Sequence, residues 1–184
     1  VDLMADANSS FPLEQAVEWA QKFRDVKLAF LEEAIPVDSP LDAWKSLAAG
    51  APMKIAGGEN MIDASTITTA MNSGVYGVLQ PDMCKFGGFS GLVPLAHQIV
   101  AKGIRFCPHM FSAAPGLMAS AHLLAASNSP DGSLEYGIEH NPPRDEFIQR
   151  EIVNGRIEIG DAPGLGITLD AVKMDRYRVA APSY

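Results

Sequence analysis

The sequence predicts an α/β fold, a parallel (β/α) barrel of the TIM type. Two observations lead to this prediction. Short apolar segments alternate with segments whose apolar residues recur at helical spacing, and the apolar segments end on polar residues at regular intervals. Strict alternation implies parallel strands, because each crossover between parallel neighbours contains a helix. A chain of 184 residues, 47% hydrophobic and 20% charged, is long enough to bury a core.

Each element is justified by its own local signals. Strand-like segments are apolar along their length, as expected for burial on both faces: 1–6, 28–33, 53–59, 75–82, 104–109 and 133–138. Helix-like segments have apolar residues at helical spacing, most with start or stop signals such as Ser, Pro, Asp or Gly at their ends: 12–23, 39–50, 63–74, 90–103 and 115–128. The chain therefore contains about six β/α units.

The last part of the chain departs from this pattern. The stretch "RDEFIQREIVNGRIEIG" predicts a short helix and then a hairpin that turns at Asn154–Gly155. The Pro- and Gly-rich stretch "DAPGLGITLD" follows. We expect residues 1–143 to form a partial barrel that carries the active site, and residues 144–184 to form a tail that packs outside the strand series.

The strand-like segments end on polar residues spaced 23 to 27 positions apart: Asp6, Glu32, Glu59, Asp82, His109 and Glu135. In a parallel sheet all these ends lie at one edge, which in a β/α barrel carries the active site. A doubly wound open sheet would gather such residues only near its switch point. Six polar ends in succession favour a closed or closing barrel.

Three of these ends are consecutive carboxylates, Asp6, Glu32 and Glu59. Converging anions without a cation would repel one another and raise their pKa values. Mg²⁺, which prefers oxygen ligands, would resolve this repulsion. The alternative is that each carboxylate is a loop cap or an exposed charge. Gly57 and Gly58, just before Glu59, favour close approach of the backbone to a ligand.

Asp82 and His109 end neighbouring strands, so their side chains could touch. A carboxylate bonded to one ring nitrogen fixes the tautomer and raises the basicity of the other, which makes a general base. The alternative is a structural histidine beside an unrelated aspartate. Two further residues could face this site: Lys85, three positions after Asp82, and His140, after the last predicted strand. The alternative for each is a structural role outside the site.

The motifs "DAN", "LEEAIP", "GGEN", "QPDMCKFGG" and "PHMFSAAPG", in this order and followed by the tail "PGLGITLD", resemble the barrel domain of the enolase superfamily, mandelate racemase subgroup. The resemblance covers residues 2–170. It implies that Asp6, Glu32 and Glu59 hold Mg²⁺ and that Asp82 and His109 form the base. It also implies that Glu135 hydrogen-bonds the substrate carboxylate or the intermediate. By the same resemblance, Asn8, Lys85 and His140 are candidates for substrate binding.

The implied activity is Mg²⁺-dependent removal of a proton α to the carboxylate of a small substrate. We expect dehydration of a sugar acid or related hydroxy acid, because this chemistry dominates the resembling subgroup. The alternatives are a racemase or epimerase of a 2-hydroxy or amino acid and a catalytically inactive barrel homologue. A metal-dependent hydrolase is disfavoured, because its H-x-H ligand pair does not occur in this sequence.

Bulk properties and the resemblance also predict the partners. A formal net charge of −8 argues against nucleic-acid binding, and no apolar run is long enough to span a membrane. Two cysteines, Cys84 and Cys107, fit a reducing, cytoplasmic compartment. The resembling family carries an N-terminal capping domain and earlier barrel strands. We expect both in the intact protein, where the tail would pack on the barrel or on the capping domain, and we expect a homo-oligomer.

Overall fold

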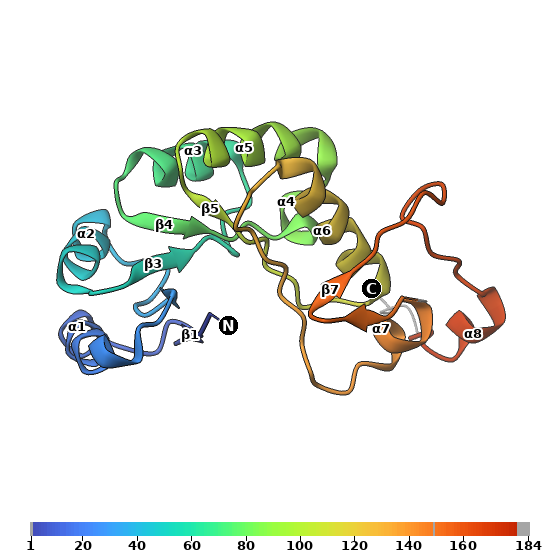
Figure 1. The fold of residues 1–184 in the computed structure, drawn as a ribbon, viewed down its shortest axis with the longest axis horizontal. Coiled ribbons are helices and arrows are strands. Elements are labelled where there is room, and N and C mark those ends of the chain that lie inside the picture. The colour runs from blue at the N-terminus through green and yellow to red at the C-terminus, as the bar shows by residue number, and fades with distance from the viewer. Residues whose placement is uncertain (1, 149, 180–184) are drawn as a thin grey trace, which may run out of the picture.

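The computed structural model describes residues 2–148 and 150–179, and within them one parallel sheet has five strands in chain order (Figure 1). The strands are β1 (Met4–Asp6), β2 (Phe30–Glu32), β3 (Lys54–Gly57), β4 (Tyr76–Leu79) and β5 (Arg105–Phe106). Each strand pairs in parallel with the next one along the chain. The predicted α/β fold of alternating strand and helix units is therefore confirmed.

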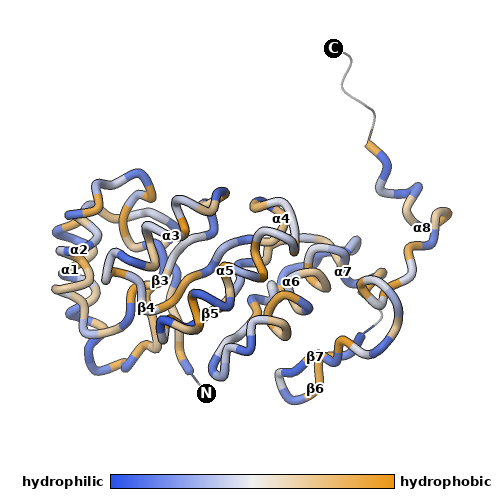
Figure 2. The backbone as a smooth tube through the Cα atoms, turned by 90° about the horizontal axis from the view of Figure 1, so that it is seen from above, coloured by the Kyte–Doolittle hydropathy of each residue, from blue (hydrophilic) through white to orange (hydrophobic). Residues whose placement is uncertain are grey.

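Helices connect the strands and follow one another along the sheet (Figure 2). They are α1 (Leu13–Lys22), the 3₁₀ turn η1 (Arg24–Val26), α2 (Leu41–Gly50), α3 (Ala64–Asn72), α4 (Met83–Phe86), α5 (Phe89–Ala101) and α6 (Ala114–Ser127). The five predicted helices begin and end within two residues of α1, α2, α3, α5 and α6, whereas the short α4 was not predicted. No helix in the described part of the chain is both long and apolar enough to cross a membrane.

The two faces of the sheet carry different cores because side chains alternate along a strand. On the helix side, Leu31 and Ile55 pack with α1 and α2, while Leu79 and Phe106 pack with α3, α5 and α6. On the inner side, one apolar layer consists of the buried residues Phe30, Ala56, Val78 and Cys107. Residues two positions beyond three members of this layer are Glu32, Gln80 and His109. A polar layer therefore lies above the apolar layer at the carboxyl ends of the strands.

The prediction of a sixth strand at residues 133–138 is wrong, because the structure has no strand there. The segment lies beside β5 but touches it through side chains: Ser133 Oγ is 3.4 Å from Cys107 Sγ and 3.3 Å from an Arg105 guanidinium nitrogen. The outer main-chain donor of β5, the Phe106 N–H, instead donates to Ser129 Oγ at 3.3 Å. The ladder that a sixth strand would need is thereby interrupted.

The tail packs on the end of the helical layer. It contains α7 (Pro142–Phe147), a hairpin of β6 (Ile152–Val153) and β7 (Arg156–Ile157), and α8 (Ala171–Asp175). The predicted turn at Asn154–Gly155 is confirmed, since both residues have positive φ, 52° and 72°, as a type I′ hairpin turn requires. Phe147 and Ile148 share a buried cluster with Leu117 and Met118 of α6. The domain division after residue 143 stays a prediction, and α7 spans it.

Gly58 fixes how closely β3 approaches β4 at the site edge. Its φ is +123°, and a Cβ at this position would lie 3.2 Å from the backbone nitrogen of Gln80. That nitrogen donates a hydrogen bond to the carbonyl oxygen of Gly57 at 2.9 Å. The close approach that the paired glycines predicted is therefore one between two segments of the protein's own backbone.

We expect Gly58→Ala to destabilise the protein more than Gly88→Ala does. Both glycines have nearly the same φ, +123° and +124°, but nothing lies within 4 Å of a Cβ built on Gly88. Each substitution should lower the free energy of unfolding by about 1–3 kcal/mol through backbone strain. Gly58→Ala should cost more because the added methyl group presses on Gln80. Urea unfolding of both variants measures the difference, and equal losses would contradict the packing argument.

Candidate active site

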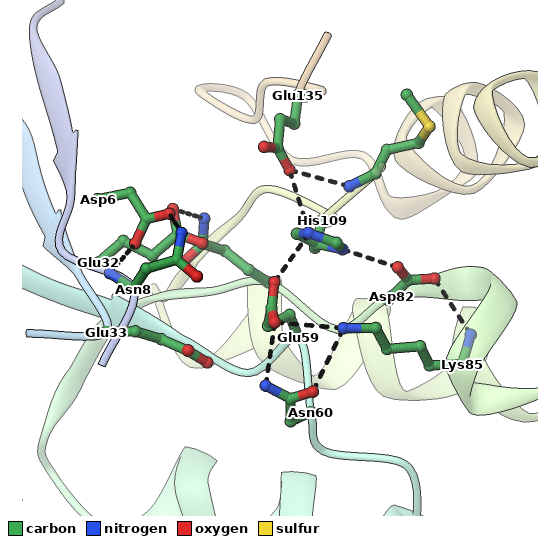
Figure 3. A network of polar contacts seen from close by, with 12 residues as sticks. Asp6, Asn8, Glu32, Glu33, Glu59, Asn60, Asp82, Lys85, His109 and Glu135 are labelled. Carbon is green, nitrogen blue, oxygen red and sulfur yellow. Dashed lines mark hydrogen bonds and ion pairs between the residues drawn. The ribbon is translucent and has the colours of Figure 1, made fainter. Parts of the chain in front are cut away.

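All the predicted site residues except His140 gather near the carboxyl ends of the strands (Figure 3). Asp6 ends β1 and stands in register with Glu32, which ends β2. Glu59 follows β3 by two residues, and His109 follows β5 by three. Parallel pairing places these ends at one edge of the sheet, as the spacing predicted.

Asp82 and His109 are in direct contact. His109 Nδ1 lies 2.7 Å from Asp82 Oδ2, and the two side chains are only 12% and 8% exposed. The other carboxylate oxygen of Asp82 accepts the N–H groups of Cys84 and Lys85 at 2.6 and 3.1 Å, so Asp82 also caps α4. Burial raises the pKa of Asp82, but the hydrogen bonds from His109 and these two backbone groups outweigh it and lower the pKa below its usual value.

The second ring nitrogen of His109 faces two more carboxylates. Nε2 lies 2.8 Å from Glu59 Oε2 and 3.7 Å from Glu135 Oε2. The same Glu135 oxygen accepts the backbone N–H of Met110 at 3.0 Å, which holds it beside the ring. Burial lowers the pKa of His109, whereas the hydrogen bond to Asp82 and the charges of Glu59 and Glu135 raise it, and the net effect is a raised pKa.

Glu59 has further partners on its other oxygen. Glu59 Oε1 lies 3.2 Å from Lys85 Nζ and accepts a hydrogen bond from Asn60 Nδ2 at 3.0 Å. Lys85 also donates to Asn60 Oδ1 at 3.3 Å. Lys85, predicted as a possible ligand contact, therefore lies within the site, but its contacts here are to the protein.

Asp6 and Glu32 form the opposite side of the site. Asn8 donates to both oxygens of Asp6, from its backbone N–H at 2.8 Å and its side-chain amide at 2.7 Å, so Asn8 holds the metal-ligand candidate in place. Burial raises the pKa of Glu32 to about 7, the nearby charges of Asp6 and Glu135 add to the rise, and a hydrogen bond from Gln80 opposes it. The charge of Glu32 is thus poorly compensated by the protein.

The chemistry of these donors fits a hard divalent cation. Asp6, Glu32 and Glu59 offer only carboxylate oxygens, and the raised pKa of Glu32 shows that positive charge would be favourable beside it. Within residues 2–148 and 150–179, however, no three His, Cys, Asp or Glu side chains converge closely enough to enclose an ion. Glu59 instead directs its oxygens at His109 and Lys85.

A cavity of about 370 Å³ opens beside these residues on the inner side of the sheet. Its lining includes both polar and apolar residues: Met4, Ala5, Asp6, Phe30, Glu32, Gln80, Cys107, Ser133, Leu134 and Glu135. This volume is large enough for a small organic acid.

Sequence reasoning missed two residues of the site and included one that the structure does not bring into it. Asn60 and Gln80 each bind a carboxylate of the site; both lie in quoted motifs, "GGEN" and "QPDMCKFGG", which were the available signal. His140 is exposed. The charged residue found to interact with it is Asp145, which belongs to the tail and not to the site. A role for His140 in substrate binding stays a prediction.

Comparisons with known proteins agree with this fold. Residues 1–173 match the family model described as enolase C-terminal domain-like. The D-galactarolactone cycloisomerase of Agrobacterium fabrum is 30% identical over 98% of this chain and 50% of its own length. The chain thus spans about half the length of the curated relatives it matches.

Two solved structures are similar along nearly the whole chain. One is described as mandelate racemase/muconate lactonizing enzyme from Bordetella bronchiseptica RB50; it is 41% identical, with a TM-score of 0.88 over 96% of this chain and 50% of that one. The other is L-talarate dehydratase from Polaromonas sp. JS666 complexed with Mg and L-glucarate; it is 25% identical, with a TM-score of 0.78 over 93% of this chain and 45% of that one.

The Asp82–His109 contact predicts a characteristic pH dependence of stability. The lowered pKa of Asp82 gives stability that is present above its unfolded value of 3.8 and is lost as the pH falls through the folded pKa. The raised pKa of His109 gives stability that is full below its unfolded value of 6.5 and is lost as the pH rises through the folded pKa.

Asp82→Asn should therefore lower the free energy of unfolding most between about pH 4 and 6.5, by roughly 1.5–3 kcal/mol for a charge-assisted hydrogen bond. Urea unfolding across pH 3 to 9 measures this difference. The matched control is Asp63→Asn, which changes the exposed cap of α3, where Asp63 has no histidine partner among its described contacts. The destabilisation caused by Asp63→Asn should not decline above pH 6.5. A parallel decline in both variants would show that the pH dependence does not come from the Asp82–His109 contact.

Proposed function

The chain belongs to the enolase superfamily, through its C-terminal domain family, and from this premise we propose that it removes the proton α to the carboxylate of a small substrate. The observation that carries the proposal is the position of His109, with Asp82 on one ring nitrogen and the carboxylates of Glu59 and Glu135 facing the other, of which Glu135 also lines the cavity. We assign His109 the role of general base.

The hydrogen bond with Asp82 supports this role. Because a carboxylate accepts, Nδ1 carries the proton in the neutral ring and Nε2 keeps the lone pair. The α-proton would move to Nε2, and the resulting imidazolium would be stabilised by Asp82, Glu59 and Glu135. The raised pKa of His109 makes the ring a stronger base, which is free to act once the pH exceeds that pKa.

We propose that Asp6, Glu32 and Glu59 hold Mg²⁺. Their donor chemistry, the raised pKa of Glu32 and the magnesium in the similar L-talarate dehydratase structure support this. When bound, the ion supplies positive charge that stabilises the negative charge developing on a substrate carboxylate. Glu135, beside His109 and in the cavity lining, is assigned to hydrogen-bond the substrate or the intermediate.

The proposed outcome is dehydration of a sugar acid or related hydroxy acid. Loss of the α-proton to His109 would leave the electron pair to form a C=C bond, and the β-hydroxyl would depart as water by taking up the proton that His109 had accepted. The similar L-talarate dehydratase supports this choice. Reprotonation of the α-carbon, as in a racemase or epimerase, is the second candidate, supported by the 41% identical structure described as mandelate racemase/muconate lactonizing enzyme. An inactive homologue remains the third.

Three properties of the whole protein are proposals of the same kind. The chain spans about half the length of its curated relatives, which supports an additional capping domain and further barrel strands. A homo-oligomer is proposed on the family resemblance. A cytoplasmic location is proposed from the two free cysteines, one exposed and one buried.

The first test is exchange of the substrate α-proton in D₂O, followed by ¹H NMR with a panel of sugar acids and Mg²⁺. The natural-length protein should exchange or eliminate at least one of them. His109→Asn should reduce the rate by at least about 10²-fold, the effect of losing a general base. The matched control is His97→Asn, because His97 lies on α5 and bonds the carbonyl of Ala126 at 2.7 Å. Unchanged exchange in His109→Asn would rule out this base.

The second test is the acid limb of the kcat/KM profile. Activity should rise with pH as His109 loses its proton, because only the neutral ring accepts a proton. The hydrogen bond to Asp82 raises the pKa of His109, so Asp82→Asn should move the limb to lower pH. Asp63→Asn should leave it in place. A shift to higher pH in Asp82→Asn would contradict the proposed pairing.

A further inference from the structure

We propose that Gln80 is a positioning residue of this site, which orients the Glu32 carboxylate for binding of a divalent cation. Gln80 Nε2 donates to Glu32 Oε2 at 2.7 Å, across 48 positions of sequence. Gln80 follows β4 and Glu32 ends β2, so the side chain reaches past β3 on the inner side of the sheet. The inference rests on the proposed function, because it requires Glu32 to be a metal ligand.

The main chain of Gln80 is fixed from two sides. Its N–H donates to the carbonyl oxygen of Gly57 at 2.9 Å, and its own carbonyl oxygen accepts the N–H of His109 at 3.4 Å. Gly58 packs directly against its backbone nitrogen. These contacts restrict where the side-chain amide can lie. The orientation of Glu32 is therefore tied to the β3 edge and to the segment that carries the base.

An amide suits this position for a chemical reason. Gln80 is only 5% exposed, and the Glu32 carboxylate, one oxygen of which it faces, is half-buried. A neutral N–H donor satisfies that oxygen and adds no charge beside Asp6, Glu32 and Glu135. An apolar residue would leave the oxygen without a donor, and an acid would add another anion.

The carbonyl oxygen at the other end of the amide supports a role in ligand binding. Gln80 Oε1 is buried and has no hydrogen-bond partner among the described residues. A buried carbonyl without a partner is destabilising, so a purely structural amide would be expected to pair it. Gln80 lines the cavity with Asp6 and Glu32, so an O–H group of a water or substrate that enters the cavity beside it would satisfy the buried Oε1.

The test is the affinity for Mg²⁺ itself, measured by isothermal titration calorimetry on the natural-length protein without substrate. Gln80→Met keeps the length of the side chain but removes the donor, and we expect Mg²⁺ to bind about 10–100-fold more weakly, the usual loss when a group that orients a ligand is removed. Gln98→Met is the matched control, because Gln98 is exposed on α5 and lies outside the site. The Mg²⁺ affinity of the Gln98→Met variant should equal that of the wild type.

Two further variants separate the possible failures. Glu32→Gln measures the loss of the ligand. A wild type that binds no Mg²⁺, or a Glu32→Gln variant that binds it equally well, would overturn the proposed metal site. Mg²⁺ binding that Glu32→Gln weakens but Gln80→Met leaves unchanged would overturn the role of Gln80 alone. Should Gln80→Met fail to fold, Gln80→Asn replaces it; this variant keeps the amide but loses its reach, and the same weakening is expected.

Discussion

The whole site depends on the two-residue period of side chains along parallel strands that are in register. The inner apolar layer of Phe30, Val78 and Cys107 fixes which face of each strand looks inward. The residues two positions later must then face inward too, at the end where the strands stop. A shift by one residue in any strand would turn its polar side chain into the helical layer. The same packing that buries the core thus gathers the acids and the imidazole.

Gathering these groups places several negative charges close together, and the protein compensates some of these charges better than others. On one side, Glu59 is matched by Lys85 and His109, and Asp82 is matched by His109 and two backbone N–H groups. On the other side, Glu32 has one neutral donor and two anionic neighbours, and its pKa rises to about 7. The imbalance separates a side on which the negative charges are matched within the protein from a side on which the charge of Glu32 is not.

Much of this arrangement was predictable because strands, helices and strand ends have strong local signals. The positions of Asp6, Glu32 and His109 follow from segment periodicity alone. Residues 133–138 were mispredicted because strand formation there depends on a distant competitor, the Ser129 hydroxyl that takes the Phe106 N–H. Gln80 was passed over because the contact that defines it, across two strands to Glu32, has no counterpart in local sequence.

Asp82 has two structural roles, since one carboxylate oxygen caps α4 and the other is hydrogen-bonded to His109. The cap stabilises the fold whether or not the histidine is present. A related chain that lost the proposed base would still be selected to keep this aspartate. Among related sequences, retention of the aspartate alone is therefore poor evidence of activity, whereas retention of the histidine, whose contacts lie with the site carboxylates, is informative.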